Sequence, residues 1–324
     1  MEKIGEKFEK AEQKEPKILY HFFFSPHVTA KDFENLGAAF KTADIYVPEI
    51  PRCPLWLKEL LGKVAQGKIS LDEVYQEFPE LNLTSARRRE FEIIHNSKKP
   101  ILIADITPKN YKYAEKRTED GALHRDVMNN FRFGNFKESL AKLRLYIKSE
   151  ADLQMEREKK IKKNLKNQIK EFLKENPEYV QKDNLKVLIR LGAYHTKLYR
   201  DLKQDKLEVS REFNRLPGVY LSFDEAKRRI IAGKEVTDEL LARGIIENYF
   251  YDFLEKISED SEKIIQVVRK LSVRLSLKNI EQISTSKNLS QNFGAGLISE
   301  LEKFNIKIPR SEKEMDEMLG IEKK

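Results

Sequence analysis

Four imidazole or carboxylate side chains stand just beyond short apolar runs of the sequence. Each run is of the kind that forms a buried strand, and the four pairs are residues 18–24 with His27, 44–47 with Glu49, 100–104 with Asp105, and 185–191 with His195. In open α/β sheets, residues directly after the carboxyl ends of parallel strands are the ones that meet ligands. We therefore expect these four side chains to share one edge of a sheet and to form a site.

The chemistry of this set suits either a metal or acid/base catalysis. Neutral imidazole and carboxylate are ligands for divalent manganese, cobalt, zinc or iron, so His27, Glu49 and His195 are the predicted metal ligands. A metal held there would acidify a bound water, and Asp105 would support it as a spare carboxylate. Without a metal, the same groups would act as an acid/base pair on an ester or amide bond. The residues alone leave both mechanisms open.

The segments between the apolar runs supply the elements that must position these side chains. Residues 55–95 show three helical patterns, one of them with the capping-box pair Ser70 and Glu73. Residues 107–135 have weak periodicity, which favours a long loop and makes them a candidate lid. Residues 136–179 keep a helical period, and we expect a break near Ser149. The sequence therefore predicts an α/β fold with a mainly parallel central sheet flanked by helices.

The last part of the chain changes in character. After residue 205 helical patterns dominate, with Ser222 and Thr237 as predicted N-caps. We divide the chain into a charged N-terminal tail (1–17), an α/β domain of catalytic type (18–204) and a helical C-terminal extension (205–324).

Composition limits the classes of function. The chain has 61 Lys and Arg against 53 Asp and Glu, and its one cysteine, Cys53, rules out an intrachain disulfide and a cysteine-rich zinc site. No signal-peptide pattern and no run of eighteen apolar residues is present, so we expect a cytoplasmic protein without a membrane span. The lysines between residues 159 and 174 and the run of three arginines at 87–89 suggest nucleic-acid binding as an alternative function. Both runs are interleaved with glutamate, which is typical of a solvated helix face.

These residues, in their order along the chain, resemble the motif pattern of the superfamily that groups the TraB and Tiki proteins, the erythromycin esterases and the ChaN haem-binding lipoproteins. Gly192-Ala193-Tyr194-His195 is similar to its second G-x-x-H motif, and Phe24-Ser25-Pro26-His27 is similar to the first in its histidine, with Phe24 in place of the glycine. Glu49 resembles the acidic strand end of the family, and Arg157 resembles its helix arginine. The resemblance covers residues 18–202.

The resemblance implies a hydrolase of peptide or ester bonds, although its members differ in activity. Tiki proteins are metal-dependent proteases, erythromycin esterases cleave a lactone with a histidine base, and ChaN binds haem. For this chain the resemblance therefore implies a divalent metal first and haem as the less favoured alternative. By this resemblance Arg157 would bind substrate charge beside His27, Glu49, Asp105 and His195. The alternative from another class is a degenerate member that binds or regulates, for which Phe24 is the cue. The sequence gives neither the substrate nor the oligomeric state.

Overall fold

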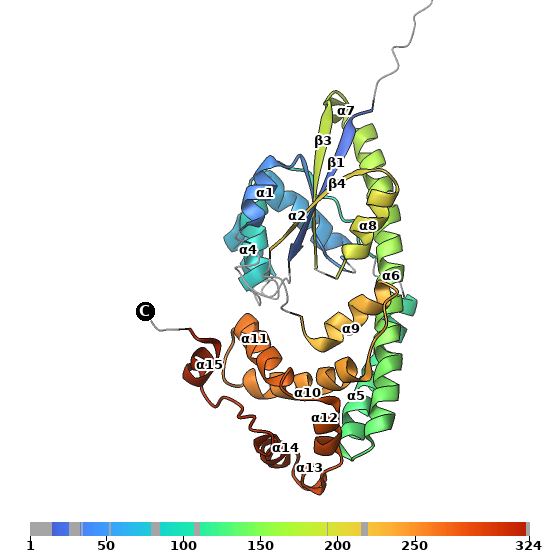
Figure 1. Ribbon diagram of the computed structural model, residues 1–324. Coiled ribbons are helices and arrows are strands. Elements are labelled where there is room, and N and C mark those ends of the chain that lie inside the picture. The colour runs from blue at the N-terminus through green and yellow to red at the C-terminus, as the bar shows by residue number, and fades with distance from the viewer. Residues whose placement is uncertain are drawn as a thin grey trace, which may run out of the picture.

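A single parallel sheet organises the first two thirds of the chain. The computed structural model describes residues 15–25, 33, 35–51, 53–78, 85–106, 111–192, 194–214 and 220–321. Its sheet has the order β2-β3-β1-β4, from strands β1 (Lys17–Ser25), β2 (Ile45–Val47), β3 (Asn184–Gly192) and β4 (Glu208–Phe213). All three pairings are parallel. With helices on both faces and at the C-terminus, this arrangement confirms the predicted α/β fold (Figure 1).

The helices after β1 and β2 cover one face of the sheet, and they are α1 (Leu36–Thr42), α2 (Leu55–Gln66), α3 (Leu71–Glu77) and α4 (Ser85–Ile94). Their apolar side chains pack on Phe23 of β1 and Leu188 of β3. The predicted capping box is confirmed, because the Ser70 side chain accepts from the backbone of Glu73 while the Glu73 carboxylate accepts from the backbone of Ser70. The three helices predicted between residues 55 and 95 are therefore all present.

One long helix, α6 (Phe136–Glu175), covers the opposite face together with α8 (Thr196–Gln204); the short α7 (Pro177–Val180) joins α6 to β3. At 1.5 Å per residue α6 is about 60 Å long. The predicted break near Ser149 is wrong, because α6 runs through that position without interruption. Its second half, through Ile161 and Leu165, packs on the apolar side chains of β1 and β3.

Residues 100–104, predicted to be a strand, form only one isolated bridge to β2. The bridge joins Tyr46 and Ile101, with one hydrogen bond on each side. Beyond it, side-chain amides of α6 replace a neighbouring strand: Gln168 donates to the carbonyl of Ile103, and Asn164 donates to the carbonyls of the next two residues. The segment is half-buried at residues 100–102 and buried at 103–104, and side chains of helix α6 donate to the carbonyls of residues 103–105 in place of a neighbouring strand.

The candidate lid is a helix. Residues Tyr111–Arg132 form α5, which makes a hairpin with α6 through the turn at Gly134. Among the side chains of α5 that the structure describes, the large apolar ones that are buried are Val127 and Phe131, both in the second half of the helix. Residues 107–110 lie outside the described residues. The prediction of a thirty-residue loop is therefore wrong.

The C-terminal region is helical except for β4, which lies in the range 205–324 and completes the sheet. The helices are α9 (Ser222–Ile231), α10 (Asp238–Leu254), α11 (Ser261–Ser272), α12 (Leu277–Ser284), α13 (Lys287–Gln291), α14 (Phe293–Glu302) and α15 (Glu312–Leu319). Thr237 caps α10 as predicted, whereas the predicted cap Ser222 is inside α9 and donates its hydroxyl to Glu247. These helices share a second large core with the first half of α6.

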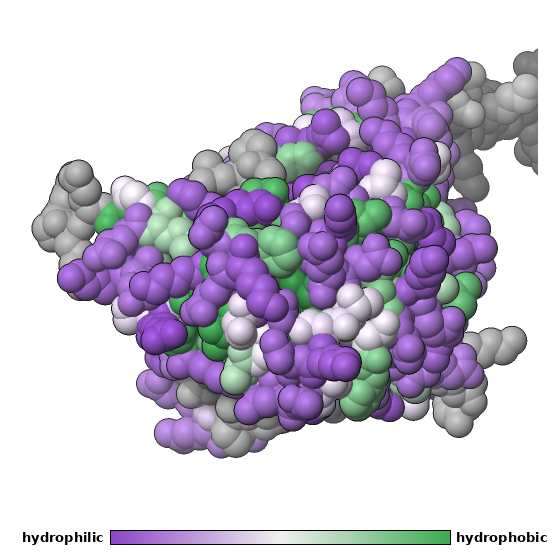
Figure 2. All heavy atoms as spheres, turned by 60° about the horizontal axis from the view of Figure 1, so that its bottom comes forward, coloured by the Kyte–Doolittle hydropathy of each residue, from purple (hydrophilic) through white to green (hydrophobic). Residues whose placement is uncertain are grey.

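The two cores meet along α6, and α9 lies between the carboxyl ends of the strands and the rest of the C-terminal helices (Figure 1). The face made by the C-terminal helices is mainly hydrophilic, with separate hydrophobic patches (Figure 2). Within the described part of the chain, no helix has the length and apolar character needed to cross a membrane.

Candidate functional site

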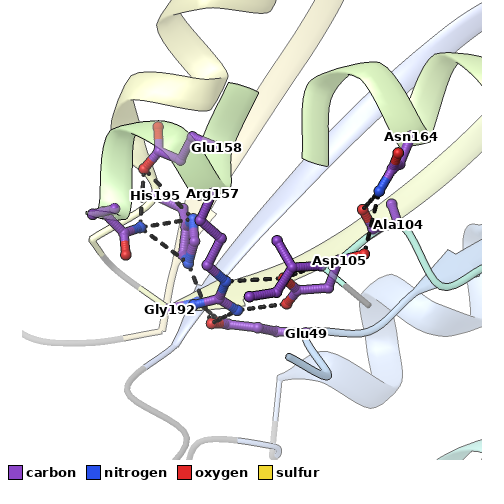
Figure 3. A network of polar contacts seen from close by, with 10 residues as sticks. Glu49, Ala104, Asp105, Arg157, Glu158, Asn164, Gly192 and His195 are labelled. Carbon is purple, nitrogen blue, oxygen red and sulfur yellow. Dashed lines mark hydrogen bonds and ion pairs between the residues drawn. The ribbon is translucent and has the colours of Figure 1, made fainter. Parts of the chain in front are cut away.

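Glu49 lies at the centre of a polar cluster beyond the ends of β2 and β3 (Figure 3). Proline residues 48 and 51 bracket it and restrict the backbone on both sides. One carboxylate oxygen, Oε2, accepts from the backbone N–H of Gly192 at the end of β3. The other, Oε1, accepts from Nη2 of Arg157 at 2.7 Å and lies 3.2 Å from Nε2 of His195. Glu49 thus joins two strand ends to α6.

Arg157 forms a two-pronged ion pair with Asp105. Its Nε donates to Oδ1 at 2.9 Å and its Nη2 donates to Oδ2 at 2.5 Å, while Oδ1 also accepts from the backbone of Ile106 at 2.7 Å. The side chains are 9% and 2% exposed. Burial by itself lowers the pKa of Arg157, but the hydrogen bonds and charges of Asp105 and Glu49 outweigh it and raise that pKa. The guanidinium is a permanent charge that holds both carboxylates in place.

His195 follows the turn after β3 and precedes the first residue of α8. Its backbone N–H donates to the carbonyl of Gly192 at 3.0 Å, and its ring is only 2% exposed. Nε2 faces Glu49, and Nδ1 lies 3.5 Å from Oε1 of Glu158. The amide nitrogen of Gln154 lies 3.0 Å from Nδ1. The imidazole is therefore held between two carboxylates, so either ring nitrogen can carry a proton that a carboxylate accepts.

Glu158 keeps a proton more readily than an ordinary glutamate. Burial raises its pKa, and the charge of His195 and a hydrogen bond from Gln154 only partly offset that effect. Within the described residues, its Oε2 is buried without a hydrogen-bond partner. Three carboxylates share this site with one guanidinium, so a proton bound by Glu158 reduces the excess negative charge.

The roles of Gln154 and Glu158 were missed by sequence reasoning, although the sequence holds a signal for them. The inward-facing stripe of α6 has alternating spacings of four and three residues. It runs Ile147, Ala151, Gln154, Glu158, Ile161, Leu165, and of these Gln154 is half-buried and the others are buried. Two polar residues thus occupy consecutive core positions of an amphipathic helix. Buried polar groups of this kind need a partner, and His195 is that partner.

A second buried ion pair lies on the same strands and was also missed. Arg190 of β3 contacts Glu90 of α4 at 2.9 Å, and both bond to the hydroxyl of Tyr46 in β2. The guanidinium also lies over the ring of Phe33, 4.8 Å from its centroid. Arg190 and Tyr46 are sequence neighbours of strand residues that face α6. Because successive residues of a strand point to opposite faces of the sheet, Arg190 and Tyr46 point away from α6. The pair braces β2, β3 and α4 behind the Glu49 cluster.

Of the predicted site residues, the structure brings together Glu49, Asp105, Arg157 and His195. His27 lies outside the described residues, as do Pro26 and Ala193 of the two predicted motifs. Arg157, predicted to bind substrate charge, contacts two carboxylates of the protein itself.

The described donors do not fit a metal by themselves. Among the described residues, no group of three His, Cys, Asp or Glu side chains is placed to hold an ion. The carboxylates of Glu49 and Asp105 are turned to Arg157, whose positive charge opposes a cation at the same oxygens. The predicted metal set depends on His27, and metal and haem both stay predictions.

We compared the chain with protein-family models, with curated proteins and with solved structures, and no family model, curated protein or solved structure matched it. The resemblance to the TraB, Tiki and erythromycin esterase proteins therefore stays a prediction.

Proposed function

We propose that the chain is a hydrolase of ester or peptide bonds in which His195 is the acid/base group. The observation that supports this most is the position of the imidazole between Glu49 and Glu158, beyond the carboxyl end of a parallel strand. A histidine with a carboxylate at each ring nitrogen can act as a proton relay: Glu158 takes the proton of an attacking water, passes it to His195, and the same route returns it to a leaving group.

The other members of the cluster have positioning roles in this proposal. Glu49 orients the ring through Nε2 and stabilises the imidazolium that forms when His195 takes a proton. Arg157 fixes Glu49, and Asp105 fixes Arg157 from the other side. Glu158 carries the raised pKa and so exchanges a proton with His195 at the remaining ring nitrogen.

The proposed reaction uses water and protein groups, and no step passes through a metal, because the described donors do not fit one. The metal-dependent form predicted from the sequence stays testable. An assay after treatment with EDTA distinguishes the metal-free from the metal-dependent mechanism, because the metal-free mechanism keeps its activity.

The test is an activity screen with a matched histidine control. Purified chain is assayed on p-nitrophenyl esters and on a fluorescently labelled protein substrate, together with the variants His195→Gln and His95→Gln. His95 is at the end of α4 and outside the cluster. The expected result is that His195→Gln lowers turnover about a hundredfold or more, the size usual for an acid/base group. Equal activity in the two variants would contradict the proposal.

One observation favours a second candidate, a protein that binds or regulates without catalysis. His195 is 2% exposed, and its ring nitrogens already face protein groups. A satisfied buried histidine of this kind can serve stability alone. This candidate predicts that the whole ester and protein panel is left intact by the natural chain, and that His195→Gln lowers its stability.

Nothing in the described structure favours nucleic-acid binding over these two. Part of the lysine face of α6 is neutralised, because Lys162 and Lys166 both contact Asp205. In the arginine run, Arg89 contacts Glu92 at 2.7 Å. Both are interactions expected of solvated helix faces.

A further inference from the structure

A basic pocket lies between α8, β4 and α9, separate from the Glu49 cluster. Its volume is about 380 Å³, within the range of small-molecule sites. Tyr194 and Thr196, the two neighbours of His195 in the sequence, line one side. The His195 ring itself is turned the other way, toward α6. The pocket is therefore a separate feature, and binding of a ligand in it does not depend on the proposed catalysis.

Five basic side chains from separate segments line this pocket, with a single carboxylate among them. The basic residues are Arg200 of α8, Arg211 of β4, Arg228 and Arg229 of α9, and Lys234. The carboxylate is Glu225, which is bound by Arg229 at 3.0 Å and lies 3.9 Å from Arg228. Within the described part of the chain, no acidic side chain forms an ion pair with Arg200, Arg211 or Lys234. The pocket thus carries a strong excess of positive charge.

Stabilisation of the carboxyl end of α9 does not explain the positive charge of the pocket. Arg228 and Arg229 lie in the last turn of α9, where basic side chains also stabilise the carbonyl end of a helix. Arg200 and Arg211 have no such role, because they come from α8 and from an edge strand. Arg211 is held over two rings, 4.8 Å from the Tyr199 centroid and 5.4 Å from that of Phe213. Its guanidinium is therefore positioned by aromatic contacts and not by an acid.

The backbone of α8 also contributes positive electrostatic potential to the pocket. Thr196 is the first residue of α8 and lines the pocket, so the positive end of that helix dipole lies at this wall. Guanidinium groups match phosphate oxygens in pairs, and several of them in one concave site suit a ligand with more than one phosphate. A single monovalent anion would leave most of this charge uncompensated.

We propose that the pocket between α8, β4 and α9 binds a small ligand through a di- or oligophosphate group. Arg200 and Arg211 grip the phosphates from the sheet side, while Arg228 and Lys234 grip them from the helical region. The ligand thus bridges the α/β part and the C-terminal helices, and its binding stabilises their packing. Pyrophosphate and the phosphate tail of a nucleotide share this chemistry, and the experiment separates them.

The test is titration calorimetry at fixed ionic strength with pyrophosphate, ATP, AMP and sulfate as probes. The natural chain is compared with Arg200→Gln/Arg211→Gln and with the control Arg125→Gln/Arg310→Gln, which removes the same charge from exposed arginines elsewhere. Pyrophosphate or ATP should bind more tightly than AMP and sulfate. The pocket variant should weaken that binding by about tenfold or more for each arginine, and the control should not.

Each outcome decides the proposal. Tight binding of pyrophosphate indicates that the phosphates alone are recognised, and binding of ATP but not pyrophosphate assigns the site to a nucleotide; both support it. Binding no tighter than that of sulfate overturns it, as does equal binding by the pocket and control variants. A single-stranded oligonucleotide that binds where both small probes fail would also overturn it. Circular dichroism of all variants confirms that the fold is kept, and Arg228→Gln provides a second pocket variant.

Discussion

Replacing Arg157 with methionine removes the one guanidinium from a cluster of three carboxylates. Methionine keeps most of the apolar stem, so the change in packing is small and the change in charge dominates. Three hydrogen bonds are lost, two to Asp105 and one to Glu49. Both carboxylates are almost fully buried, at 2% and 11% side-chain exposure. The variant leaves them without their counter-charge.

The expected cost follows from the loss of one partner of a buried ion pair, which is about 3–5 kcal/mol. The lower end applies here, because Asp105 keeps the N–H of Ile106 and Glu49 keeps the N–H of Gly192. We therefore expect Arg157→Met to lower the free energy of unfolding at neutral pH by about 3 kcal/mol.

The assay is urea unfolding followed by circular dichroism at neutral pH, with Lys163→Met as control on the exposed side of the same helix. The double variant Arg157→Met/Asp105→Asn removes one unpaired charge, so it should lose less than the sum of the single variants. A loss close to that of Lys163→Met would refute the reasoning. So would a double variant whose loss equals that sum.

Three further predictions concern stability, each measured by urea unfolding. Burial by itself raises the pKa of Asp44, but the hydrogen bond and charge of Lys182 outweigh burial, so the pKa is lowered overall. The ionised Asp44 therefore stabilises the fold above the ordinary carboxyl pKa. This stabilisation disappears as the pH falls through the lowered pKa. Asp44→Asn should thus cost up to about 1 kcal/mol at neutral pH and nothing in acid; an equal cost at both would contradict this. Leu165→Ala empties a fully buried position between α6 and the sheet and should cost about 3 kcal/mol, and a loss below about 1 kcal/mol would mean that the site collapses. Ser70→Ala removes the cap of α3 and should cost about 1 kcal/mol, whereas Ser70→Thr should restore most of it; equal stability of the two variants would count against the capping box.

The sequence predicted most of the sheet because its strands carry local signals. Residues 18–24 and 185–191 are apolar runs bounded by turn residues, and they form β1 and β3 in parallel register. The runs also located Glu49 and His195, since parallel strands place their carboxyl ends on one edge. Asp105 reaches the same cluster from a segment that is bridged to β2 at one position only. Local patterning therefore sufficed for both the fold class and the position of the cluster.

Where the sequence failed, a distant partner decided the structure. Segment 100–104 has the composition of a strand, but α6 supplies amide side chains to its backbone in place of a neighbouring strand. β4 was missed for the converse reason, because its side chains are mostly exposed and only pairing with β1 makes it a strand.

By itself, the sequence determined that this chain forms a parallel α/β sheet, and that Glu49 and His195 follow its strands, because the period of apolar residues is a local property. The tertiary structure alone decided which groups these side chains contact. Gln154 and Glu158 reach His195 from a helix about forty residues away, and Arg157 contacts the carboxylates of Glu49 and Asp105. Contacts of this kind depend on how α6 packs across the sheet edge, and that packing is set by two cores drawn from the whole chain.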